Sequence, residues 1–174
     1  MNQEDIHTLL QKHVRAVEQR GVENLNADYP YLFSKTEAYP VLCDALLEKI
    51  KNVHFDYVAS IETLGFPMAG AIVHAWRVGF IAIRKEGALP GAILQSANFT
   101  VPYKKRETVL EIQKDIPLKG KNVLLFDEAI DTGASLIHAV NLLKMAGADV
   151  PALLTLTNYP NLQKIEGIDV LSLI

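Results

Sequence analysis

The stretch from residue 121 to residue 136 constrains the fold of this 174-residue chain more than any other. Residues 123–126 are all apolar, which is typical of a strand buried on both faces of a parallel sheet. Two carboxylates, Asp127 and Glu128, follow directly, and apolar residues then recur at helical spacing from Leu136 to Leu143. The pattern predicts a strand, a turn and a helix, as found in α/β folds.

The turn over residues 129–135 has the chemistry of a phosphate site. Backbone N–H groups at a helix N-terminus attract anions, and Gly133 allows a close approach of the ligand. The hydroxyls of Thr132 and Ser135 add donors, and the acidic pair beside the turn is suited to ribose hydroxyls or a magnesium ion. The alternative is an ordinary turn in which an acidic residue caps the helix. Because acids, threonine, glycine and serine coincide in register, the phosphate site is favoured.

Composition bounds the class of protein. Hydrophobic residues make up 49% of the chain, charged residues 21%, and the formal net charge is −3. These values predict one globular domain that does not bind nucleic acid. A single cysteine, Cys43, excludes an internal disulfide, and the amino terminus lacks the basic and apolar regions of a signal peptide. The longest apolar region, residues 68–83, is interrupted by His74 and Arg77, so we expect a cytoplasmic protein without a membrane span.

The first 40 residues predict one helix followed by an irregular region. Apolar residues on one face of this helix are Ile6, Leu9, Leu10, Val14 and Val17. Gly21 is the expected stop, and residues 21–40 are rich in aromatic side chains and contain Pro30 and Pro40.

Strand patterns and helix patterns alternate along the chain after residue 40, which predicts a parallel sheet. A helix is expected to begin at Pro40, and a strand over residues 55–61, a helix over 66–76 and a strand over 79–83 form a β-α-β unit with a right-handed crossover. Residues 150–156 and 170–174 predict further strands. Residues 92–100 and 108–112 predict the two strands of a long hairpin with a mobile tip.

Three motifs resemble those of the type I phosphoribosyltransferases. The acidic pair and turn at 127–135 resemble the family's signature for phosphoribosyl pyrophosphate (PRPP). Residues 60–66 resemble the pyrophosphate loop of the adenine phosphoribosyltransferases, and residues 84–91 resemble the Arg-Lys-Pro-Gly-Lys-Leu-Pro-Gly stretch of the same enzymes. The motifs occur in the family's order. The resemblance implies the type I fold: a central, mainly parallel five-stranded sheet flanked by helices, a small hood and a flexible hairpin loop. It implies one domain, with the hood mainly in residues 1–40 plus the C-terminal segment and the core in about 41–157.

The resemblance also implies roles for individual residues. The ribose and 5′-phosphate of PRPP would bind Asp127, Glu128, Ala129, Ile130, Asp131, Thr132, Gly133, Ala134 and Ser135. Pyrophosphate would bind Thr63, Leu64, Arg84 and Lys85, with Lys104, Lys105 and Arg106 arriving as the hairpin loop closes over the site. Glu62 and Asp131 would be catalytic, and Phe33 and Ala129 would contact the base. Mg²⁺ would lie near Asp127 and Glu128, chiefly through indirect contact.

The implied function is a purine phosphoribosyltransferase of purine salvage, with adenine as the favoured base. Asp131 occupies a position where hypoxanthine-guanine enzymes have an Asp proposed to handle the proton on purine N7, so hypoxanthine, guanine or xanthine is the alternative. Leu64 and Ala88 replace an Arg and a Lys that the adenine enzymes usually carry. These two losses leave open a PRPP-binding regulator or an inactive relative. The family also implies a homodimer.

Overall fold

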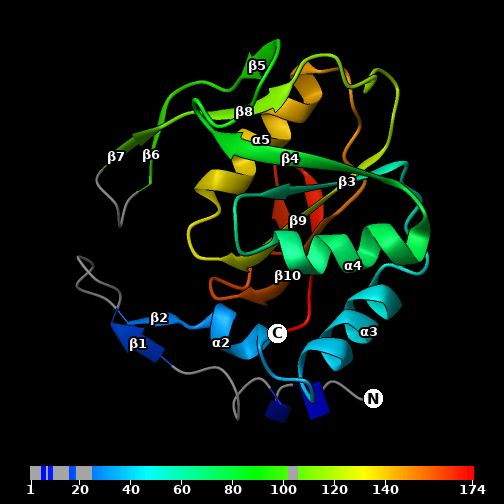
Figure 1. Cartoon of the computed structure of the whole chain (residues 1–174), viewed down its shortest axis with the longest axis vertical. Helices are drawn as coiled ribbons and strands as arrows, with labels where there is room; N and C mark the ends of the chain where they lie inside the picture. Colours follow the sequence, from blue (N-terminus) through cyan, green and yellow to red (C-terminus); the bar gives the residue numbers. More distant parts are fainter. Residues whose placement is uncertain (1–4, 7, 10–15, 19–24, 102–105) are drawn as a thin grey trace.

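The structure is a computed structural model that describes residues 5, 6, 8, 9, 16–18, 25–101 and 106–174 (Figure 1). Its helices are α2 (Tyr29–Phe33), α3 (Tyr39–Lys49), α4 (Phe66–Trp76) and α5 (Ala134–Met145). The strands of the main sheet are β3 (Tyr57–Ile61), β4 (Gly79–Lys85), β5 (Ile93–Gln95), β8 (Leu110–Gln113), β9 (Val123–Ile130), β10 (Leu153–Asn158), β11 (Lys164–Ile165) and β12 (Ile168–Ser172). Two separate ladders pair β1 (Ala16–Glu18) with β2 (Leu25–Ala27) and β6 (Phe99–Val101) with β7 (Arg106–Thr108).

The main sheet has the strand order β11-β12-β10-β9-β3-β4-β8-β5. Its five central strands, β12, β10, β9, β3 and β4, are parallel, which confirms the predicted sheet. Strands β11, β8 and β5 extend it antiparallel at the two edges. At one edge the chain reverses in the tight turn of Glu166 and Gly167, both with positive φ, which is the backbone that a short hairpin requires.

Helices cover both faces of the sheet, as expected for parallel strands (Figure 1). Along β9, Val123 and Leu125 join the core beneath α5, whereas Leu124 and Phe126 join the core beneath α3 and α4. The apolar run 123–126 is therefore buried on both faces, as its composition predicts. None of the helices in the described part of the chain has the length and apolarity needed to cross a membrane.

The predicted hairpin is present as two successive antiparallel ladders, β5 with β8 and β6 with β7. Its base packs on α5, because the buried ring of Phe99 stacks on His138 with 4.1 Å between ring centroids and 10° between ring planes. The tip, residues 102–105, lies outside the described residues.

The amino-terminal prediction is partly wrong. Residues 5, 6, 8 and 9 are helical, but Ala16–Glu18 form β1 instead of continuing the helix. Pairing with β2 overrides the helical spacing of the apolar residues there. Residues 29–33, expected to be irregular, form α2, because the Asp28 carboxylate caps its N-terminus by accepting from the Tyr31 N–H at 3.0 Å and Pro30 occupies the first turn.

Candidate active site

The carboxyl ends of β9, β3 and β4 lie side by side and carry the three motifs. These strands are parallel, and Ser60 of β3 is in register with Ala82 of β4 and with Phe126 of β9. The acidic pair, the 62–65 loop and the Arg84-Lys85 pair therefore lie at the same end of the sheet. Tertiary structure brings the motifs together at the place where α/β sheets generally bind ligands.

The acidic pair lies within β9 instead of after it. Ala129 and Ile130 continue the ladder with Thr157 and Asn158 of β10, so the prediction that the strand ends at residue 126 is wrong. Asp127 is half-buried, and burial together with the negative charge of Glu128 raises the pKa of its carboxyl group. Two crowded carboxylates favour a ligand that donates hydrogen bonds or carries positive charge.

The predicted phosphate turn runs directly into α5. Asp131 and Thr132 are exposed, and Gly133 has φ of 79°, a backbone conformation that favours glycine. The Ala134 N–H donates to Thr132 Oγ1 at 3.3 Å, and no side chain of the described residues forms an N-cap hydrogen bond at Gly133. The half-buried Ser135 lies in the first turn. The arrangement presents the positive end of the helix dipole and two hydroxyls to an anion.

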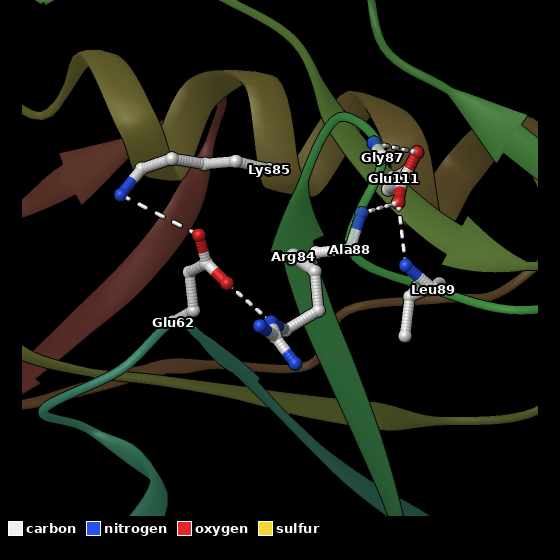
Figure 2. A network of polar contacts seen from close by, with 7 residues as sticks. All are labelled: Glu62, Arg84, Lys85, Gly87, Ala88, Leu89 and Glu111. Carbon is white, nitrogen blue, oxygen red and sulfur yellow. Dashed lines mark hydrogen bonds and ion pairs between the residues drawn. The ribbon is translucent and has the colours of Figure 1, made fainter.

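A charged cluster forms where β3 and β4 end (Figure 2). Glu62 is 11% exposed, and its two carboxylate oxygens take different partners. Oε2 accepts from Arg84 Nε, and Oε1 lies 3.5 Å from Lys85 Nζ. Arg84 and Lys85 are the last two residues of β4, so the strand is two residues longer than the predicted span 79–83. Both cations keep exposed surface, so they can also face an anionic ligand.

Glu62 is the counterion of this cluster. Burial alone raises the pKa of its carboxyl group, but the Arg84 hydrogen bond and the Lys85 charge outweigh burial, and the pKa is lowered. Thr63 and Leu64 are exposed on the adjoining loop, which suits contact with a ligand. A direct catalytic role for Glu62 stays a prediction.

The predicted loop ligands are only partly described. Lys104 and Lys105 lie outside the described residues, and of Arg106 only the backbone, in β7, is described. Their contact with pyrophosphate stays a prediction.

Helix α2, in the segment predicted to form the hood, is joined to the rest of the domain by aromatic residues. The half-buried ring of Phe33 lies between Tyr29 and Tyr39, with centroids 6.1 Å and 5.9 Å away. The Tyr39 hydroxyl donates to the Pro67 carbonyl at 2.8 Å, and the buried Tyr29 hydroxyl is hydrogen-bonded to Thr157 Oγ1 at 2.5 Å. Phe33 thus helps to pack α2 on the core, and its predicted contact with a base stays a prediction, as does that of the half-buried Ala129.

Two residues that sequence reasoning did not assign lie at this site. Tyr159 follows β10 with 63% of its surface exposed, and its N–H donates to the Ile130 carbonyl at 3.1 Å, directly before Asp131. Glu111 is a buried carboxylate in β8 beside the Arg84-Lys85 pair. The sequence signal for Glu111 is a charged residue between two apolar ones, Leu110 and Ile112, in a strand whose neighbours are buried.

Comparison with known proteins gives the family. Residues 36–163 match the phosphoribosyl transferase domain. The chain belongs to the phosphoribosyltransferase family. It is 33% identical to the adenine phosphoribosyltransferase of Dinoroseobacter shibae over 135 residues, which is 78% of this chain and 74% of the relative. It is 34% identical to that of Methylobacterium radiotolerans over 157 residues, 90% of this chain and 85% of the relative.

Solved structures agree with this assignment. The crystal structure of adenine phosphoribosyltransferase from Thermoanaerobacter pseudethanolicus superposes with a TM-score of 0.86, at 25% sequence identity and over 99% of both chains. The predicted type I phosphoribosyltransferase fold, and the predicted closeness to the adenine enzymes, are therefore confirmed, and the chain is a phosphoribosyltransferase.

Proposed function

We propose that this chain transfers the phosphoribosyl group of PRPP to adenine, forming adenosine monophosphate and releasing pyrophosphate. One observation carries the proposal: a phosphate turn, an acidic pair and a cation cluster meet at the carboxyl edge of β9, β3 and β4. PRPP has a 5′-phosphate, ribose hydroxyls and a pyrophosphate group, and each has a chemically matched partner there. The names of the relatives support adenine as the base.

The reaction breaks the bond between ribose C1 and the pyrophosphate oxygen and forms a bond from C1 to a ring nitrogen of adenine, whose proton is lost. The turn before α5 would hold the 5′-phosphate, and Asp127 and Glu128 would accept hydrogen bonds from the ribose hydroxyls. Negative charge builds up on the departing pyrophosphate, and Arg84 and Lys85 are placed to stabilise that charge.

The residues present fit a magnesium ion that arrives with the substrate. Among the described residues, no three His, Cys, Asp or Glu side chains converge to form a complete metal site. Mg²⁺ typically uses one or two carboxylates plus substrate phosphates and water, and the crowded pair Asp127 and Glu128 provides those carboxylates. When bound, the ion would neutralise part of the charge on the pyrophosphate group.

The exposed ring of Tyr159 offers a surface for stacking on the base. Its backbone N–H is bonded to Ile130 O, which holds the residue beside the phosphate turn, and the Tyr29-Thr157 hydrogen bond joins the hood to the same strand. A planar purine between the hood and the core would gain aromatic contact from this ring.

The decisive experiment is turnover by the purified chain with PRPP, Mg²⁺ and one of adenine, hypoxanthine, guanine, xanthine or orotate. We expect nucleotide and pyrophosphate in equal amounts with adenine. Asp127→Asn and Glu128→Gln should each abolish turnover, while Asp149→Asn, on the far end of the sheet beside Asn122, should not. Absence of product with every base would overturn the proposal.

Two observations favour alternatives that this assay resolves. Asp131 is exposed at the turn, where a carboxylate suits a 6-oxopurine, so turnover with hypoxanthine or guanine alone would reassign the base. Leu64 exposes 36% of its surface where the adenine enzymes usually have an Arg. Binding of PRPP without turnover would make the chain a regulator or an inactive relative.

We also propose a cytoplasmic homodimer. Phe80 is 39% exposed on β4 and packs edge to face on Phe66 at 5.2 Å, which supplies an apolar surface for a second copy. Cys43 is buried and its thiol pKa is raised by burial, in keeping with a structural cysteine in a reducing compartment. Sedimentation of the chain and of Phe80→Ser tests the dimer, which the substitution should dissociate.

A further inference from the structure

Glu111 is a buried carboxylate that the proposed reaction does not use. It lies in β8 between Leu110 and Ile112 and is 2% exposed, which makes it the most buried of the charged residues that the structure describes. A buried carboxylate is costly unless hydrogen bonds compensate for lost hydration. Its partners therefore indicate what the residue is for.

Among the described residues, the three groups that donate to the Glu111 carboxylate are backbone N–H groups of one turn (Figure 2). Oε1 accepts from Ala88 and Leu89, each at 2.9 Å, and Oε2 accepts from Gly87 at 3.2 Å. Gly87 has φ of 81°, so the turn adopts a backbone that few other residues would adopt unaided. The 87–89 turn is folded around this one carboxylate.

This turn directly follows the two cations of the pyrophosphate site. The backbone of Arg84 is in register with that of Glu111, and Lys85 with Leu110. Beyond Lys85, the Glu86 N–H still donates to the Val109 carbonyl at 3.1 Å. The carboxylate of Glu111 then accepts hydrogen bonds from the next three residues. Backbone pairing with β8 therefore holds Arg84 and Lys85 themselves, and the Glu111 side chain holds the turn that follows them.

The same residue also connects to the hairpin. β8 pairs with β5 on its other side, where Glu111 is in register with Gln95. The Leu110 N–H donates to Ser96 Oγ at 3.0 Å, and the Ser96 N–H donates to the Leu110 carbonyl at 2.8 Å. A displacement of Glu111 would therefore also displace the end of β4 and the base of the hairpin loop.

We propose that Glu111 is a positioning residue for pyrophosphate: by folding the 87–89 turn around its carboxylate, it sets where Arg84 and Lys85 present their charges. The inference rests on the proposed function, because it concerns the same pyrophosphate site. Glu111 itself makes no contact with the ligand in this account.

Loss of the Glu111 charge and loss of its positioning role would change the affinity for pyrophosphate in opposite directions, which makes the inference testable. Removing a negative charge close to Arg84 and Lys85 would strengthen their attraction for pyrophosphate if electrostatics alone mattered. Losing the position of the two cations would weaken it. A substitution that deletes the carboxylate therefore separates the two effects by the direction of the change.

The experiment is calorimetry of pyrophosphate binding to the full chain, Glu111→Leu and Glu111→Gln, at a temperature well below each melting point. We expect the dissociation constant of pyrophosphate to rise about tenfold in Glu111→Leu, which is close to the loss of one charge-assisted hydrogen bond. The amide of Glu111→Gln retains an oxygen for Ala88 and Leu89, so we expect a smaller rise. Binding of ribose 5-phosphate, which uses the turn before α5, should be unchanged in both.

A further variant keeps the test independent of folding defects and of charge. Gly87→Ala places no atom within 4 Å of a neighbour but opposes the positive φ of the turn, so it should also weaken pyrophosphate binding with ribose 5-phosphate binding intact. Unchanged or tighter pyrophosphate binding in Glu111→Leu or, if that variant does not fold, in both Glu111→Gln and Gly87→Ala, would overturn the positioning role alone. Absence of pyrophosphate binding by the unaltered chain would overturn the proposed function and this inference with it.

Discussion

Gly65, at the start of α4, has no room for a side chain. A Cβ atom built on Gly65 would lie 2.4 Å from Ser60 Oγ and 3.4 Å from the ring of Phe126. The backbone does not require glycine, because φ is −70° and ψ is −23°. The requirement is steric and comes from Ser60, whose hydroxyl is buried and has no hydrogen-bond partner among the described residues.

These distances set the expected cost of Gly65→Ala. Overpacking a well-packed core by one methyl typically costs about 1–3 kcal/mol, and alanine is also a poorer N-cap residue than glycine by up to about 1 kcal/mol. Ser60→Ala removes the colliding oxygen and a buried hydroxyl without a partner, so by itself it should leave stability unchanged or raise it by about 1 kcal/mol. In the double variant Ser60→Ala/Gly65→Ala the Cβ meets only Phe126, and most of the lost stability should return.

The unaltered chain, the two single variants and the double variant form a double-mutant cycle. Urea unfolding of these four proteins gives the coupling free energy between positions 60 and 65. We expect a coupling of about 1–3 kcal/mol, and a fall in melting temperature of about 2–4 °C per kcal/mol for Gly65→Ala. The matched control is Gly70→Ala, within the same helix, where an added Cβ would have no neighbour within 4 Å. It should stabilise the chain by about 0.5–1 kcal/mol.

The same variants should also affect ligand binding, because Gly65 is the last residue of the loop that begins at Glu62. Gly65→Ala should weaken pyrophosphate binding, and Ser60→Ala should restore it in the double variant. If Gly65→Ala proved as stable as the unaltered chain, or if the two substitutions were simply additive, the steric account would be refuted.

Three further predictions follow from the site. Arg84→Met should weaken pyrophosphate binding about tenfold or more while ribose 5-phosphate binding is unchanged, because it removes one charge-assisted contact; calorimetry measures both. The lowered pKa of Glu62 means that its ion pairs stabilise the fold above the ordinary carboxyl pKa and that this stabilisation is lost as pH falls through the folded-state pKa. The unaltered chain should therefore be more stable to urea than Glu62→Gln at pH 7, with the difference shrinking on acidification; a difference independent of pH would contradict this. Tyr29→Phe should cost about 1–3 kcal/mol by leaving Thr157 without its phenol partner, and should cost less on a Thr157→Val background, as thermal unfolding of the four proteins would show.

Much of the fold could be predicted because its main elements have local signals. The span predicted for α4, residues 66–76, is the span observed, since proline lies in its first turn and Arg77 ends it in the left-handed conformation. The apolar run 123–126 predicted a strand buried on both faces, and the structure buries it on both faces. The predictions failed where pairing with another strand decides: β1 replaced the end of a predicted helix, and β9 ran on to Ile130 because β10 offers a partner there.

The candidate site, like the fold, was predictable from the sequence only in part. The sequence by itself determined which chemistry is present: the acidic pair, the glycine of the phosphate turn and the Arg-Lys pair are each recognisable from residue type and spacing. Only the tertiary structure decided that Glu62 is the counterion of Arg84 and Lys85, that Ser60 excludes a side chain at Gly65, and that Glu111 holds the turn after β4. Each of these contacts joins residues on different strands or their connecting loops. Local pattern cannot reveal the contacts of Glu62 and Glu111, because they depend on the register of parallel and antiparallel neighbours, which is set when the whole sheet assembles.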